Sequence, residues 1–247
     1  MTTAPPTRRE RLRTATVTEI KDAARRLLVT GGPAAISLRA IARDMGMTPA
    51  ALYRYYPSLE ELVAALCADL YDDCTAHLEK ARDACPPDEP GAQVFAVCRE
   101  FRRWSVAHPA EFGLMFGSPV PELVSDHDPS REPHAAGQRF ALVFASLFGA
   151  LWARAPFPVL ADDDVDPDLR PQLHAYLDEL GAPLPVGAAQ MFLSCWIRLY
   201  GMVALEVFGH LHFALTDPEP MFEAELALAA RQLGVEPCPP NAGAAGS

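Results

Sequence analysis

The segment "SLRAIARDMGMTPAALYRYYPS", from Ser37 to Ser58, decides the fold that we expect for this chain. Ser37 is a good N-cap for a short helix, and Gly46 can adopt the positive φ that a tight turn after that helix needs. Thr48 can cap the next helix, and Pro49 suits its first turn because the N–H group that proline lacks has no partner there. The spacing therefore predicts two short helices joined by a tight turn.

The two short helices have distinct inner and outer sides. The inner side carries the apolar residues that can form a small core: Ile41, Met45, Met47, Leu52 and Tyr56. Ala42 is small at the place where the two helices have to touch. The outer side of the second helix carries Pro49, Ala50, Tyr53 and Arg54. This pattern is typical of a helix-turn-helix unit whose outer side enters the major groove of DNA.

Charge is distributed unevenly along the chain, which has a net charge of −11. Residues 1–57 contain ten Lys or Arg and four Asp or Glu, a balance of +6, so the remainder carries −17. This asymmetry indicates a basic end that meets a polyanion and an acidic body that stays in solvent. Duplex DNA fits that description, and the charge alone would also fit an anionic membrane surface.

The rest of the chain also has helical periodicity, and strand-like alternation is nearly absent. We expect helices over residues 16–29, 38–45, 48–56, 58–84, 92–107, 135–154, 169–180, 186–211 and 218–233, with a short one after Pro109. The predicted fold is therefore all-α, with an N-terminal three-helix helix-turn-helix domain followed by a larger helical domain. We expect a flexible basic arm over 1–14, the helix-turn-helix domain over 15–62, the larger domain over 63–236 and a disordered tail over 237–247.

Few sequence features favour catalysis or a bound metal. The six cysteines form no CxxC pair. His210 and His212 lie about 200° apart around a helix, so they cannot share a metal unless the helix has ended before them. The acidic run at 162–166 is typical of a solvated loop, and no GxSxG or phosphate-binding glycine loop occurs. We therefore predict no catalytic residue, no metal site and no cofactor. The absence of an N-terminal signal segment favours a cytoplasmic protein.

The motif "AISLRAIARDMGMTPAALYRYYPSLEELVAAL" resembles the DNA-binding segment of the TetR family of transcriptional regulators. The family pattern has a serine or threonine, an "IA…G" turn, an "LY" pair followed by aromatic or histidine positions, and then "EEL". Two later segments, "HPAEFGLMFG" and "WIRLYGMVALEVFGH", are similar to landmarks of one carboxy-terminal subclass of the family. In the second segment Tyr200 stands where histidine is common.

The resemblance implies roles for particular residues in DNA binding. Arg39 lies where family members touch a base edge, and its guanidinium suits O6 and N7 of guanine. Base-facing positions of the recognition helix are implied for Pro49, Ala50 and Tyr53, and phosphate-facing positions for Ser37, Thr48, Ala51 and Tyr55. Arg54 is a further candidate on the outer side. Leu59 replaces a usual lysine, so the salt dependence of binding should be about one unit flatter.

A dimer and an effector are the other implications. A two-fold operator requires paired readers, and we expect a homodimer through the last two long helices. The resemblance also implies an apolar cavity for a small-molecule effector in the acidic body. The candidate lining residues are aromatic or Met side chains of the body: Phe101, Trp104, Met115, Phe116, Phe140, Phe144, Trp196 and Tyr200.

The predicted function is thus a homodimeric repressor that a small apolar ligand releases from a palindromic operator. Two alternatives remain open from the sequence. A DNA-binding architectural protein without a ligand switch would keep the basic helix-turn-helix unit and lack the cavity. An enzyme with an appended helix-turn-helix unit would keep its activity after that unit was deleted.

Overall fold

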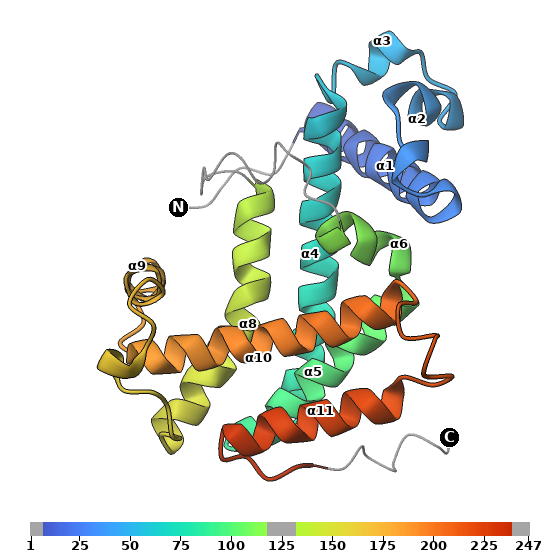
Figure 1. Ribbon diagram of the computed structural model, residues 1–247. Coiled ribbons are helices and arrows are strands. Elements are labelled where there is room, and N and C mark those ends of the chain that lie inside the picture. The colour runs from blue at the N-terminus through green and yellow to red at the C-terminus, as the bar shows by residue number, and fades with distance from the viewer. Residues whose placement is uncertain (1–6, 118–131, 239–247) are drawn as a thin grey trace. The chain divides into compact units, whose positions relative to one another are not determined.

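A computed structural model of the protein describes residues 7–117 and 132–238. The regular elements of these residues are all helical, which confirms the predicted all-α class (Figure 1). The described residues divide into two compact units. The first, the N-terminal unit, contains residues 7–75, 108–117 and 132–140; the second, the C-terminal unit, contains 76–107 and 141–238.

The N-terminal unit is built from short helices around the first long one. Its elements are α1 (Arg8–Gly31), η1 (Pro33–Ala35), α2 (Leu38–Asp44), α3 (Pro49–Leu52), the first part of α4 (Leu59–Asp83), α6 (Pro109–Phe112), η2 (Gly113–Gly117) and the first part of α8 (Glu132–Arg154). The division inside α4 falls after Thr75, later than the boundary after residue 62 that the sequence suggested. Residues 108–117 and 132–140 also belong to the N-terminal unit rather than to the body.

Helix α1 begins much earlier than the sequence suggested. Residues 8–14, expected in a flexible arm, are helical because Thr7 and Glu10 form a capping box. The Thr7 hydroxyl accepts the Glu10 N–H at 3.3 Å, and Glu10 Oε2 accepts the Thr7 N–H at 2.6 Å. These bonds from Thr7 lower the pKa of the Glu10 carboxyl. Residues 1–6, also assigned to the arm, lie outside the described residues.

The turn between α2 and α3 has the predicted geometry, whereas α3 is shorter than predicted. Gly46 has φ +64°, and the Met47 N–H reaches the Ala42 carbonyl at 2.8 Å. Helix α3 ends at Leu52 because the N–H groups of Arg54 and Tyr55 bond three residues back, to Ala51 at 3.3 Å and to Leu52 at 2.9 Å. The expected helix up to residue 56 is therefore one α-helical turn continued by tighter turns.

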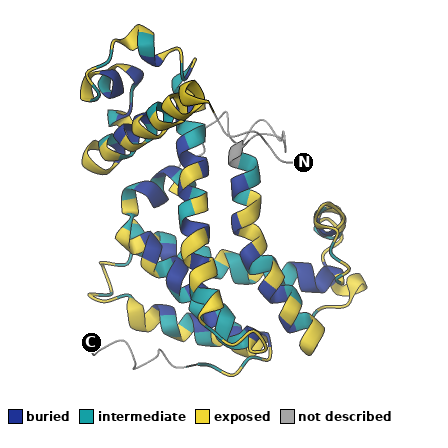
Figure 2. Cartoon of the chain, turned by 180° about the vertical axis from the view of Figure 1, so that it is seen from behind, coloured by how far each residue is buried: buried dark blue, intermediate teal, exposed yellow. Residues whose placement is uncertain are grey.

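The core of the N-terminal unit lies under one side of each of its first four helices. Its fully buried residues include Ile20, Leu28, Ile41, Leu52 and Leu62. Figure 2 shows the corresponding division of α1 into buried and exposed sides. Burying each of these side chains contributes about 1.5–3 kcal/mol, so this core fixes the crossing of α2 and α3.

The C-terminal unit holds the remaining long helices. It contains the second parts of α4 and α8 together with α5 (Pro90–Ala107), η3 (Asp162–Asp164), α9 (Arg170–Leu180), α10 (Val186–Val207) and α11 (Glu219–Gln232). Helix α10 packs against α5, α9 and α11. It ends at Val207 rather than at 211 because Gly209, at φ +71°, closes a Schellman turn in which the His210 N–H bonds the Leu205 carbonyl at 2.8 Å.

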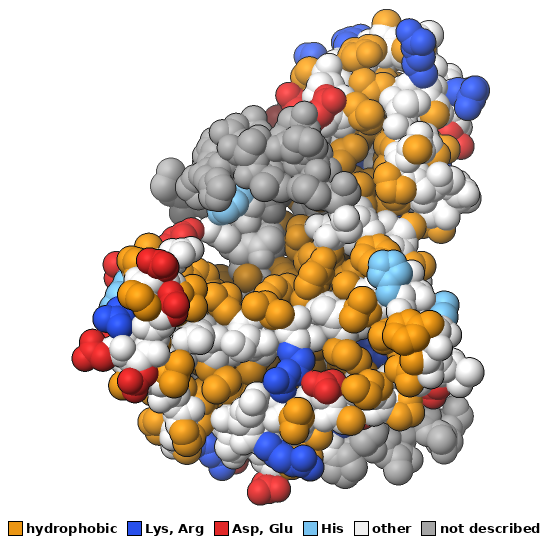
Figure 3. Space-filling model, in the orientation of Figure 1, with side chains coloured by type: hydrophobic (Ala, Val, Ile, Leu, Met, Phe, Trp, Pro, Cys, Tyr) orange, Lys and Arg blue, Asp and Glu red, His pale blue; other side chains and the backbone are white. Residues whose placement is uncertain are grey.

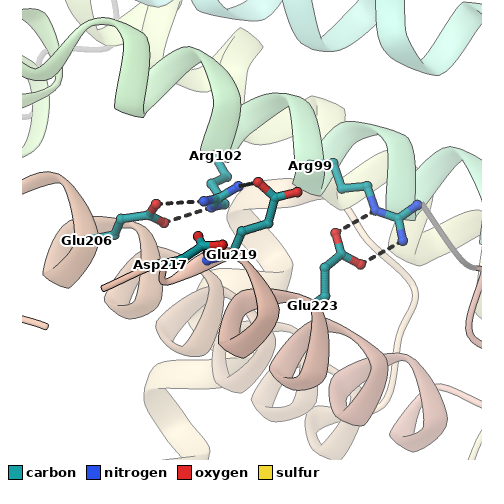
Figure 4. A network of polar contacts seen from close by, with 6 residues as sticks. All are labelled: Arg99, Arg102, Glu206, Asp217, Glu219 and Glu223. Carbon is teal, nitrogen blue, oxygen red and sulfur yellow. Dashed lines mark hydrogen bonds and ion pairs between the residues drawn. The ribbon is translucent and has the colours of Figure 1, made fainter. Parts of the chain in front are cut away.

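Two arginines of α5 bind carboxylates of α10 and α11 within the C-terminal unit (Figure 4). Arg99 makes a bidentate pair with Glu223 at 2.8 and 2.7 Å, and these hydrogen bonds raise the pKa of Arg99. Arg102 binds both oxygens of Glu206 at 2.7 Å and also Glu219 at 3.0 Å. Bidentate pairs of this kind fix both distance and orientation, so they hold α5 against α10 and α11.

We expect Arg102→Ala to lower the free energy of unfolding by about 3 kcal/mol, because it leaves the Glu206 carboxylate without its main partner at 9% side-chain exposure. The matched control is Arg231→Ala, which removes an exposed arginine of α11 and should cost less than about 0.5 kcal/mol. Urea unfolding at one fixed protein concentration measures both. Equal stability of the two variants would contradict a stabilising role for the Arg102 pairs.

Candidate DNA-binding surface and ligand cavity

The two capping residues use their hydroxyl oxygens to start α2 and α3. Ser37 Oγ accepts the Ala40 N–H at 3.1 Å, and Thr48 Oγ1 accepts the Ala51 N–H at 3.3 Å. Each hydroxyl keeps its own O–H group as a donor. Both side chains therefore stand at helix N-termini, where an O–H donor and the positive end of the helix dipole suit a phosphate oxygen.

All nine predicted DNA-contacting residues lie in α2 and α3 or within three residues of them and are at least partly exposed, and together we call them the recognition surface. Its exposed members are Arg39, Thr48, Pro49, Ala50, Tyr53 and Arg54, and its half-buried members are Ser37, Ala51 and Tyr55. Tyr53 is 52% exposed, whereas Tyr56 is buried in the core. The basic side chains over α2 and α3 in Figure 3 are arginines, because residues 37–58 contain no lysine. The surface is thus polar, basic and open on the side away from the core.

The sequence analysis did not foresee that the basic N-terminal residues join this surface as part of a helix. The Arg13 guanidinium lies 5.8 Å from the centroid of the Tyr55 ring, within cation–π range. Arg9 and Arg13 are four residues apart in α1, so they lie on the same side of that helix. The capping box at Thr7 is the sequence signal that could have revealed the helical start.

Packing explains why position 59 can carry leucine where the TetR pattern usually has lysine. The Leu59 side chain is half-buried and packs against the core of the N-terminal unit. The start of α4 is capped instead by Ser58, whose Oγ accepts the Glu61 N–H at 3.1 Å. A leucine at this position adds apolar burial and provides no cation.

The eight predicted ligand-lining residues fall into the two separate units. In the N-terminal unit Phe116 and Phe140 have ring centroids 5.8 Å apart, and Met115 is their neighbour in η2. In the C-terminal unit the rings of Phe101, Phe144 and Trp196 lie 5.5–5.9 Å from one another, and Tyr200 stacks on Trp196 at 5.9 Å. Trp104 is buried in α5.

An apolar cavity of about 90 Å³ lies inside the C-terminal unit, between α5, α8, α10 and α11. Of the eight predicted residues, Phe144 and Trp196 line it and the other six do not. The lining residues outside the eight predicted ones are Val94, Val97, Cys98, Leu147, Phe148, Leu151, Phe192, Cys195, Arg198, Leu199, Met202, Phe222, Glu225, Leu226, Ala229, Ala230 and Leu233. Phe148, Phe192 and Phe222 among them are aromatic, but the signal that the whole set shares is spacing, because the contributors from each helix recur three and four residues apart.

A second, larger hollow of about 480 Å³ is lined by residues at the start of α5, at and after the end of α8, and after α11. Charged side chains, backbone and prolines contribute much of its lining, including Glu89, Arg154 and Pro156. Ligand sites are predominantly apolar with a few placed polar groups, so we take the smaller cavity as the candidate site.

Cysteine chemistry at the cavity is suppressed by burial. Desolvation raises the pKa of the Cys98 thiol to about 12, and burial also raises the pKa of Cys195. Cys67, in the core of the N-terminal unit, likewise has its pKa raised to about 12 by burial. These thiols are therefore protonated at neutral pH and serve as apolar lining or core atoms.

With this geometry established, comparison with known proteins gives the family. Residues 20–66 match "Bacterial regulatory proteins, tetR family", and residues 94–229 match "Tetracyclin repressor-like, C-terminal domain". The chain belongs to the TetR family of transcriptional regulators, so it is a DNA-binding regulator and not an enzyme.

Individual relatives support this assignment. The HTH-type transcriptional regulator Rv1816 of Mycobacterium tuberculosis is 35% identical over 216 residues, which cover 85% of this chain and 88% of the relative. The crystal structure of the regulatory protein SCO4313 has a TM-score of 0.67 at 32% identity, covering 90% and 98% of the two chains. A tetR-family regulator from Rhodococcus RHA1 shares the fold, with a TM-score of 0.57 at 17% identity over 89% and 97%.

We expect Cys67 and Cys98 to resist alkylation by iodoacetamide at pH 8 in the native protein, with Cys238, which is half-buried, as the reactive control. Because burial raises the pKa of these thiols from the ordinary value of 9.0 to about 12, their contribution to stability is complete below pH 9 and is lost as pH rises towards 12. Mass spectrometry after timed labelling measures the first effect and urea unfolding at pH 8 and 10.5 the second. Labelling of Cys98 at the rate of Cys238 would contradict its burial.

Proposed function

We propose that the protein is a homodimeric repressor whose recognition surfaces bind a palindromic operator and whose small-molecule effector releases it. The observation that carries the DNA-binding part is the recognition surface itself. Leu52 is fully buried, so the rest of α3 turns outward, and Arg39 on α2 is exposed on the same unit. An exposed, basic helix-turn-helix surface of this kind fits the major groove.

Within the recognition surface we assign contacts by chemistry. Arg39 reads a base edge through its planar guanidinium, and Pro49, Ala50 and Tyr53 provide apolar and ring contacts to bases. Phosphates are bound by the remaining polar members, Ser37, Thr48, Arg54 and Tyr55, and by the N–H groups near Ala51. Arg9 and Arg13 extend the basic area along α1 and supply charge that Leu59 does not.

The apolar exposure of α10 supports the dimer. Among the described residues, α8 and α10 are long and apolar enough to cross a membrane, a property that a covered helix of a soluble protein shares. Only 17% of the most apolar stretch of α10 is buried within the chain, and Ile197 is 68% exposed. In Figure 3 the side of α10 and α11 that faces the viewer is largely hydrophobic. A second copy that pairs through α10 and α11 would bury this surface.

Continuity of two helices supports the proposed coupling between effector and operator. Helix α8 carries Phe144, Leu147 and Phe148 into the cavity and contributes Phe140 to the N-terminal unit. Helix α4 likewise contains residues of both units. An effector that binds better to one position of α8 would shift the population towards that position and alter the spacing of the recognition surfaces.

We expect Arg39→Ala and Tyr53→Ala each to weaken operator binding by about 1–3 kcal/mol, because each removes a base contact. A preferred sequence is first selected from random DNA, and fluorescence anisotropy then measures binding at several salt concentrations. Arg154→Ala in the C-terminal unit is the control and should bind as the wild type does. Sequence-indifferent binding by the wild type would favour the architectural alternative, and wild-type affinity in both variants would contradict the assigned surface.

We expect Ile197→Asp to dissociate the dimer, because it would place a charge in the apolar contact of α10. Light scattering should give twice 26.8 kDa for the wild type and 26.8 kDa for the variant. Leu160→Asp, at an exposed apolar residue outside the long helices, is the matched control and should stay dimeric. A wild-type monomer, or a dimeric Ile197 variant, would count against pairing through α10.

A further inference from the structure

The cavity of the C-terminal unit has one charged corner in an otherwise apolar lining. Arg198 of α10 and Glu225 of α11 are the only charged residues among its lining residues. Arg198 Nε lies 3.6 Å from Glu225 Oε2, and Arg198 Nη1 donates to Gln232 Oε1 at 3.3 Å. Their side chains are 32% and 28% exposed. The cavity is therefore apolar in its interior and polar at one place on its edge.

The polar contacts of Arg198 are longer than those of Arg99 and Arg102, the two α5 arginines of the same C-terminal unit. Charge-assisted N–H···O bonds are usually 2.7–2.9 Å long. Arg99 and Arg102 reach that range with bidentate carboxylates, whereas both contacts of Arg198 are longer than 3.2 Å. A guanidinium has five N–H donors, so Arg198 retains donor capacity for another acceptor.

Arg102 shows that one guanidinium of this unit can serve two carboxylates at once. It binds Glu206 at 2.7 Å and Glu219 at 3.0 Å. A ligand carboxylate could therefore bind Arg198 while Glu225 stays in place. Arg198 would then hold two carboxylates, as Arg102 holds those of Glu206 and Glu219. A ligand amine would have to compete with Arg198 for Glu225, whereas a neutral hydroxyl would make a weaker bond to the guanidinium.

The cavity volume limits the rest of the ligand. A water molecule needs about 10–15 Å³ of such space, so the cavity of about 90 Å³ accepts roughly six to nine groups of that size. The five aromatic side chains in the lining, Phe144, Phe148, Phe192, Trp196 and Phe222, offer apolar contact and no fixed acceptor. The part of the ligand that fits the cavity is therefore an unsubstituted hydrocarbon of roughly six to nine such groups.

We propose that this cavity binds a small monocarboxylic acid, with its hydrocarbon body among the aromatic side chains and its carboxylate on Arg198. Under the proposed function, this proposal names the chemical class of the effector. Only the regulatory role of the ligand rests on the proposed function. Binding itself is a property of the C-terminal unit and is measurable without DNA.

The test uses octanoate, whose seven carbons beyond the carboxylate match the cavity, together with 1-octanol and octylamine. Trp196 lines the cavity, so tryptophan fluorescence and calorimetry on the whole protein report binding. We expect octanoate to bind at least about tenfold more tightly than either analogue. Equal binding of octanoate and octanol, or no saturable octanoate binding, would overturn the proposal.

Three variants separate the charge from the cavity. Arg198→Gln should weaken octanoate at least tenfold and leave octanol unchanged, and Ala229→Phe should abolish binding of both by filling the cavity. Arg231→Gln, on the exposed side of α11, should bind as the wild type does. Circular dichroism checks that each variant is folded. Wild-type octanoate binding by Arg198→Gln would overturn the carboxylate assignment, and wild-type binding by Ala229→Phe would overturn the cavity.

Operator release is measured separately so that the two proposals fail in different ways. Arg198-dependent octanoate binding without any change in operator affinity would leave the site standing and reject its role as the effector switch. Release of the operator by another compound, with no octanoate binding, would reject the carboxylate site and leave the repressor function intact.

Discussion

Burial of Leu52 determines which side of α3 faces solvent. Helix α3 has only four residues, and Leu52 is its one fully buried side chain, in contact with the same core as Ile41 and Ala42 of α2. With Leu52 fixed inward and Gly46 fixing the turn, Thr48 and Tyr53 have to point away from the core. The basic recognition surface is thus a consequence of the apolar packing beneath it and of the caps that Ser37 and Thr48 provide.

The sequence predicted the elements that depend on single caps and turn residues, and it missed the helix start that depends on a reciprocal capping box. Ser37 and Thr48 act through side-chain bonds to N–H groups three residues on, and Gly46 acts through its positive φ, so the α2–α3 turn could be predicted from three residues. The helical start at Arg8 depends on reciprocal bonds between Thr7 and Glu10, which an apolar-periodicity reading does not detect. After α3 the N–H groups of Arg54 and Tyr55 bond carbonyls three rather than four residues back, and apolar periodicity does not predict this change either.

The residues that line the cavity could be predicted only in part, for a different reason. Aromatic content pointed to Phe101 and Trp104, yet both are buried in packing, because large rings fill a core as readily as they line a cavity. The lining is instead set by where four helix surfaces meet, which no single helix encodes. Phe144 and Trp196 were found because they lie on those surfaces, whereas the small residue Ala229 and the charged residue Arg198 gave no aromatic signal.

Contacts between α4 and α8 decide how a change at the cavity could reach the recognition surface. Within the N-terminal unit Arg139 of α8 binds Asp72 of α4 at 2.6 Å, but both side chains are half exposed, so this pair contributes at most about 1 kcal/mol. The rings of Phe140 and Tyr71, 5.6 Å apart, connect the same two helices by apolar contact, and Phe116 packs against both. Phe140 is buried, so displacing it costs more than breaking the exposed pair. Under the proposed switch, a movement of α8 would reach α4 chiefly through these aromatic rings, and this coupling would persist at salt concentrations that screen Arg139 and Asp72.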